Sequence, residues 1–128
     1  MAVLGQIVGA LGAGKLADAI GRKKSTVLLI VSYAVFALLE RHGATYCVTS
    51  GAGMPCVPRA TTEDVYLRFH GPDAQHLYVG SYPEAELQRW AARIAGWRAA
   101  GLGVVAYFNN DIGGAAVRDA QRLRALVT

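Results

Sequence analysis

The stretch DVYLRFH, residues 64–70, predicts a β-strand that ends at a turn, because a Gly-Pro pair follows it directly. Another strand is predicted downstream over GVVAYFN, residues 103–109. Upstream, residues 35–48 read as a helix end, a glycine stop and a short strand rich in β-branched and aromatic side chains. A loop rich in glycine and proline joins that short strand to residue 64. The sequence therefore predicts about three strands.

The clearest helix is predicted between the second and third strands. A capping-box pattern of Ser81 and Glu84 indicates its start, and Gly101 indicates its end. Its apolar stripe, with both tryptophans as core contacts, consists of Leu87, Trp90, Ala91, Ile94 and Trp97. A final helix carries on one face Ala116, Ala120, Leu123 and Val127. Strands that alternate with helices in this order predict a parallel sheet with right-handed crossovers.

Composition excludes several functional classes. The chain has 128 residues, of which 53% are hydrophobic, so it contains enough apolar material for a core. Its net charge of +4 is not arranged as a basic stripe interleaved with aromatic residues, so nucleic-acid binding is not expected. Cys47 and Cys56 stand nine residues apart without a second pair, which predicts two reduced thiols and no metal site. No cofactor can be assigned from the sequence.

The opening segment, which includes GALGAGKLADAIGRKKSTVLLI at residues 9–30, admits three interpretations. A phosphate-binding loop fits until Leu16 replaces the hydroxyl residue that would hold magnesium. A secretory signal fits the basic cluster before an apolar run but lacks a convincing cleavage site. The third interpretation fits more positions. Residues 14–24 resemble the G-x-L-A-D-x-x-G-R-K signature of major facilitator superfamily transporters, although Ala19 stands where that family usually has a basic residue.

The transporter resemblance implies a helix-loop-helix segment over residues 1–34. A membrane span needs about 20 apolar residues, whereas residues 1–14 and 26–39 offer fourteen each. Transport by this chain alone is therefore not expected. Association with a membrane through residues 1–39 stays open as an alternative to a cytoplasmic location.

Several motifs further along the chain resemble the C-terminal part of the YecE-like family, domain of unknown function 72 (DUF72). In chain order they are FALLERHG at 36–43, YLRFHG at 66–71, Tyr82, the helix that contains Trp90, and YFNND at 107–111. The resemblance implies a TIM-barrel-like fold, which usually takes about 250 residues. We therefore predict an α/β fold: an incomplete TIM-barrel-like parallel sheet over residues 35–128, preceded by an apolar helical segment.

Barrel enzymes place their chemistry at the carboxyl ends of the strands. The candidate residues at these ends, with Tyr82 added from the resemblance, are Ser50, Arg68, His70, Asn109, Asn110 and Asp111. Arg68 suits an anionic group, His70 suits proton transfer near neutral pH, and Asp111 suits a base. Ser50, Tyr82, Asn109 and Asn110 are candidate ligand-binding residues. The alternative is structural: strand-end Arg and Asn side chains often satisfy loop carbonyls, and Asp111 before Ile-Gly-Gly resembles a helix N-cap.

Three functional hypotheses follow. The first is a YecE-like barrel fragment, fused to the transporter-like segment, without a complete activity of its own. The second is a membrane-associated protein that anchors a small α/β module. The third is a half-barrel enzyme that is active only as an oligomer. Three strands cannot close a barrel, so the open sheet edges also make self-association a possible property of the chain.

Overall fold

The computed structural model describes residues 22–128. Its helices and strands are α2 (Arg22–Arg41), β1 (Cys47–Ser50), β2 (Asp64–Phe69), α3 (Glu84–Ala99), β3 (Gly103–Phe108), the short 3₁₀ helix η1 (Ile112–Gly114) and α4 (Ala115–Val127). The chain divides between Leu38 and Leu39 into two compact units. Most of the transporter-like segment expected at residues 1–34 lies outside the described residues. The part that is described belongs to α2, a single helix that continues past residue 34.

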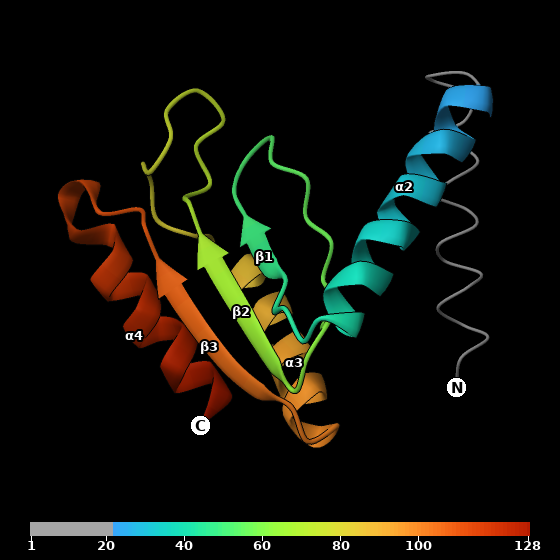
Figure 1. Cartoon of the computed structure of the whole chain (residues 1–128). Coiled ribbons are helices and arrows are strands. Elements are labelled where there is room, and N and C mark those ends of the chain that lie inside the picture. The colour runs from blue at the N-terminus through green and yellow to red at the C-terminus, as the bar shows by residue number, and fades with distance from the viewer. Residues whose placement is uncertain (1–21) are drawn as a thin grey trace. The chain divides into compact units, whose positions relative to one another are not determined.

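The three strands form one parallel sheet in the order β1-β2-β3, which confirms the predicted arrangement (Figure 1). β2 is the central strand, and both of its neighbours pair with it along their length. β1 begins at Cys47, later than the predicted strand. Tyr46 is not part of the strand, because its N–H donates to the Thr61 hydroxyl at 2.8 Å and not to a strand partner.

The hydrophobic core lies between one face of this sheet and the helices α3 and α4. On β2 the core residues are Val65, Leu67 and Phe69, each at most 1% exposed. They pack in one cluster with Leu87, Trp90, Ala91 and Ile94 of α3 and with Leu123 of α4. Phe69 is at its centre: its ring stacks on Phe108 at 4.3 Å and meets Trp90 edge-on at 5.2 Å between centroids. The predicted apolar stripe of α3 is confirmed.

The opposite face of the sheet carries the alternate residues of each strand. The strand register aligns Cys47, Tyr66 and Val105 in one row and Thr49, Arg68 and Tyr107 in the next. We call these six residues the open face, because α3 and α4 pack on the other side. Val105 and Tyr107 are 47% and 52% exposed, which is high for apolar side chains on a sheet.

The predicted capping box of α3 is wrong. Pro83 occupies the N-cap position without a side-chain cap, and the Ser81 hydroxyl donates to Asp119 of α4 instead. Two acidic residues, Glu84 and Glu86, lie in the first turn, where they interact favourably with the helix dipole. The predicted stop is confirmed, because α3 ends at Ala99 and Gly101 follows with a φ of +84°.

Over residues 22–128, no helix combines the length and the apolarity that a membrane span requires.

Candidate functional site

Arg68 is the charged side chain of the open face, and its guanidinium group is held by neutral partners. Its Nε donates to Asn109 Oδ1 at 2.8 Å, and its Nη1 lies 3.3 Å from the Tyr66 hydroxyl. No carboxylate forms an ion pair with Arg68 anywhere in residues 22–128. Asn109 follows β3 directly, so the two residues come from the carboxyl ends of neighbouring strands. Both side chains are partly buried.

Two tyrosines flank this guanidinium group on the open face. The rings of Tyr66 and Tyr107 lie 5.5 Å apart between centroids, and Tyr107 occupies the same row as Arg68. A planar guanidinium beside aromatic rings, with its Nε and one terminal nitrogen already oriented, is well suited to hold an anion. Sequence analysis did not select either tyrosine, although strand alternation places both on the face that carries Arg68.

His70 comes directly after β2 and is partly buried. Its main-chain N–H donates to the Ser50 carbonyl at 2.7 Å, while its side-chain Nδ1 is buried without a hydrogen-bond partner. Burial, reinforced by the positive charge of Arg68, lowers the pKa of the His70 imidazole below its usual 6.5. The imidazole is therefore neutral near pH 7, the state in which it can accept a proton.

A buried carboxylate on α4 organises the loops beyond the strand ends. Asp119 is 0% exposed. Its Oδ2 accepts hydrogen bonds from the Tyr82 N–H at 2.9 Å and from Asn110 Nδ2 at 2.8 Å. Its Oδ1 accepts from the Ser81 hydroxyl and from Arg122 Nη1, the latter at 3.0 Å. The carboxylate thereby joins the loop after β2, the loop after β3 and helix α4.

Two candidate ligand-binding residues belong to this buried network. Asn110 is 0% exposed, and its Nδ2 also donates to the Gly80 carbonyl at 2.8 Å. Tyr82 is 1% exposed; its hydroxyl donates to the Ser50 carbonyl at 2.9 Å and accepts from the Gly71 N–H at 3.0 Å. Both side chains hold the strand ends in position. Of the two, Asn110 has an unused atom, since its Oδ1 is buried without a partner.

The structure separates the remaining candidates. Ser50 is paired with Phe69, so its side chain lies on the helix-covered side of the sheet, away from Arg68. Asp111 is exposed and occupies the N-cap position of η1, as the structural alternative predicted, but its side chain makes no capping hydrogen bond. The geometry therefore brings Arg68, Asn109 and His70 together at one end of the sheet and leaves Ser50 and Asp111 apart from them.

Sequence analysis missed Asp119 and Arg122. A signal was present, because Asp119 is next to Ala120 on the apolar face of the last helix, three residues after Ala116 and four before Leu123. An acidic residue on an apolar stripe indicates a buried, hydrogen-bonded carboxylate. Within residues 22–128 no three His, Cys, Asp or Glu side chains gather as they would around a metal ion.

Comparison with known proteins agrees with this architecture. The sequence model of the family described as "Protein of unknown function DUF72" matches residues 30–128. A solved DUF72 family protein from Thermotoga maritima MSB8 is 24% identical, with a TM-score of 0.67 over 72% of this chain and 40% of that one. Another, from Enterococcus faecalis V583, is 18% identical, with a TM-score of 0.69 over 75% of this chain and 41% of that one. A search of curated proteins finds no significant match.

At these identities the two solved structures establish a shared TIM-barrel-like fold. The chain spans about two fifths of their length. The family match confirms the resemblance proposed for residues 36–128 and extends it to residue 30. It gives no support to the transporter resemblance, and it begins inside the segment expected to be separate from the barrel.

Proposed function

Because the chain belongs to the DUF72 family, whose function is unknown, we propose that it forms part of a barrel that binds a small anion at the carboxyl ends of its strands. In this proposal Arg68 binds the anion, Asn109 and Tyr66 orient the guanidinium group, and His70 accepts a proton from the bound molecule. The barrel part corresponds to residues 35–128, and residues 1–34 are a separate segment.

The observation that carries the proposal is the uncompensated charge of Arg68. A guanidinium group without a carboxylate partner retains its full capacity for an external anion, and partial burial strengthens that attraction relative to bulk water. The hydrogen bonds from Arg68 to Asn109 and Tyr66 fix the orientation of the guanidinium group. Because both partners are uncharged, they leave its positive charge uncompensated. Parallel sheets of α/β proteins bind ligands at this same end of their strands.

The role of His70 rests on its position and its lowered pKa. A group that acts as a general base must be unprotonated at the working pH, and burial together with the Arg68 charge keeps His70 in that form. Its buried, unpartnered Nδ1 has no internal hydrogen bond to lose when a ligand approaches. Of the sequence candidates, Asp111 and Ser50 have no part in this proposal because their side chains lie elsewhere.

Thermal unfolding of the full chain in the presence of inorganic phosphate or malonate tests the proposal. A ligand that binds only the folded state raises its stability by about 2.7 kcal/mol at a hundred times its Kd. We expect both anions to raise the Tm, and we expect Arg68→Gln to remove most of that increase. Arg124→Gln removes an exposed arginine of α4 and serves as the control, with the increase retained.

Two results would contradict the proposal. One is the absence of any increase in Tm with phosphate or malonate, compared with sodium chloride at the same ionic strength. The other is an increase that is equally large in the unmodified chain and in Arg68→Gln, because the anions would then act elsewhere on the protein.

A second candidate function, a half-barrel enzyme that works only as an oligomer, is favoured by the open face. Val105 and Tyr107 expose apolar surface beside Arg68, and another protein surface would bury it. Association there would also exclude water from the guanidinium group and enclose the anion site. We also propose that the protein is located in a reducing compartment such as the cytoplasm. The free thiols of Cys47 and Cys56 support this location.

A further inference from the structure

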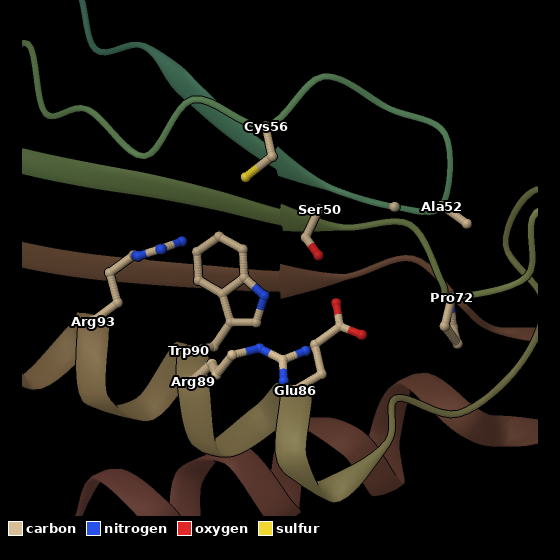
Figure 2. A pocket seen from close by; sticks show the side chains of 9 residues that line it. Ser50, Ala52, Cys56, Pro72, Glu86, Arg89, Trp90 and Arg93 are labelled. Atoms are coloured by element: carbon tan, nitrogen blue, oxygen red, sulfur yellow. The ribbon is translucent and has the colours of Figure 1, made fainter. Parts of the chain in front are cut away.

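A cavity lies on the helix-covered side of the sheet, on the opposite face from the anion site proposed above. Its volume is about 270 Å³, which suits a small metabolite. The loop after β1 forms one wall and the first three turns of α3 form the other (Figure 2). Cys56 points into it from the loop, while Trp90 and Pro72 contribute apolar surface.

Three charged side chains of α3 line this cavity: Glu86, Arg89 and Arg93. They are spaced at i, i+3 and i+7, so they follow one face of the helix in the order negative, positive, positive. Opposite charges three residues apart on a helix often pair, yet none of the three forms an ion pair with any described residue. The cavity therefore presents separated charges with a net charge of +1.

Arg93 is held in place over the indole of Trp90, with its guanidinium carbon 5.1 Å from the ring centroid. Figure 2 shows Arg93 on one side of Trp90 and Glu86 on the other, beside Ser50. Burial raises the pKa of the Cys56 thiol; the positive charge of Arg93 opposes this shift and the negative charge of Glu86 adds to it. The opposite charges thus converge on the same small space.

We propose that this cavity binds an acidic amino acid, a molecule that carries one ammonium group and two carboxylates. The ammonium group pairs with Glu86, and the two carboxylates pair with Arg89 and Arg93. Residues four apart on a helix have side chains about 5–6 Å apart at Cβ, a spacing that two carboxylates joined by a three-carbon chain can span. The methylene groups of the ligand then lie against Trp90 and Pro72.

Protection of Cys56 from alkylation tests this proposal on the unmodified full chain. Iodoacetamide reacts with the thiolate, and burial raises the pKa of Cys56, so the reaction is run near pH 8.5. Mass spectrometry distinguishes Cys56 from Cys47, which lies on the open face and is the internal control. We expect L-glutamate to slow modification of Cys56 in a saturable way and to leave Cys47 unaffected.

A matched series of ligands assigns each charge. Glutarate lacks the ammonium group, L-glutamine lacks the charge of the side-chain carboxylate, and 4-aminobutyrate lacks the α-carboxylate. We expect each to require at least about tenfold more ligand than L-glutamate for half-protection, a factor typical of one lost charged contact. Glu86→Gln should remove the preference for glutamate over glutarate, whereas Arg124→Gln should preserve it.

The proposal is overturned if L-glutamate does not protect Cys56, if it protects Cys47 equally, or if glutarate protects as well as glutamate. These outcomes are decided on the unmodified chain, so they do not depend on whether a variant folds. They are also independent of the anion site, because Arg68→Gln should leave the protection of Cys56 intact.

Discussion

At the scale of single residues, Asp119 has the most partners of any buried polar side chain described above. Its carboxylate is inaccessible to water, and each oxygen accepts hydrogen bonds from two different groups. Burial of a carboxylate is costly unless it is paired and hydrogen-bonded. Here Arg122 supplies the opposite charge and also donates to the Tyr82 carbonyl at 2.9 Å. Asp119 therefore stabilises the loops that begin at the proposed anion site.

Replacement of this carboxylate should strongly destabilise the protein. Asp119→Ala leaves the Tyr82 N–H and the Asn110 amide buried without acceptors, so we expect the free energy of unfolding to fall by about 3 kcal/mol or more. Urea denaturation measures this change. Asp111→Ala is the control, because Asp111 is exposed and its side chain makes no capping hydrogen bond, and its effect should stay within about 0.5 kcal/mol. A loss for Asp119→Ala as small as that of the control would contradict the structural role.

His70 should make the stability of the protein depend on pH. Its pKa is lowered in the folded state from the usual 6.5, so the unfolded chain binds a proton more readily. The free energy of unfolding therefore decreases as the pH falls from about 6.5 toward the lowered value and is fully retained above that window. Urea denaturation near pH 7.5 and near pH 5.5 should show this decrease, and it should shrink in His70→Gln. An equally steep decrease in His70→Gln would show that another group is responsible.

At the scale of elements, the connection between β2 and α3 determines where His70 and Tyr82 lie. Gly71 begins it with a φ of +96°, a conformation that disfavours any side chain. A Cβ at Gly71 would lie only 2.5 Å from the Val79 carbonyl oxygen. Tyr78, further along the same loop, has a φ of +69° and donates its N–H to the His70 carbonyl at 2.9 Å. The loop is therefore folded tightly back onto the strand end.

Two glycine substitutions separate the cost of the contact between Gly71 and Val79 from the cost of a positive φ alone. Gly71→Ala introduces both a positive-φ alanine and a collision with the main chain, so we expect a loss of stability above about 2 kcal/mol. Gly101→Ala has a similar φ of +84° with open space around its Cβ, so we expect only about 1 kcal/mol. Thermal or urea unfolding of the two variants measures the difference, and equal losses would contradict the importance of the contact.

At the scale of the whole chain, the sheet of residues 39–128 is covered on one side and open on the other. In the solved relatives the chain corresponds to about two fifths of a complete protein. The exposed Val105 and Tyr107 belong to β3, which is an edge strand of the described sheet. Exposed edges and apolar faces favour association with another protein surface.

We therefore expect the full chain to self-associate as its concentration rises. Val105 contributes exposed apolar surface to the edge of the open face, and a carboxylate there opposes its burial, so Val105→Glu should lower the association constant by at least about tenfold. Val117→Glu changes an exposed valine of α4 and is the matched control. Size-exclusion chromatography with light scattering gives the mass at each concentration. A chain that stays monomeric, or a control that dissociates as readily as Val105→Glu, would contradict association through the open face.

Local patterns in the sequence were sufficient for the elements and their order. The turn after residue 70, the apolar stripe of α3 and the glycine stop at Gly101 each depend on neighbouring residues, and each is present in the structure. The parallel sheet followed from the alternation of strands and helices. The strand-end location of Arg68, His70 and Asn109 was also predictable, because the carboxyl ends of parallel strands share one edge of a sheet.

Only the tertiary structure decided what each polar side chain does. Ser81 looked like a helix cap but bonds to Asp119, which is 38 residues away in the chain. Asn110 and Tyr82, which the sequence offered as ligand-binding candidates, hold loops together around the same carboxylate. The physical reason is that backbone periodicity acts over a few residues, whereas a buried polar group must find its partner wherever packing places one. The sequence by itself determined the sheet and its helices, and long-range packing determined the environment of each candidate site residue.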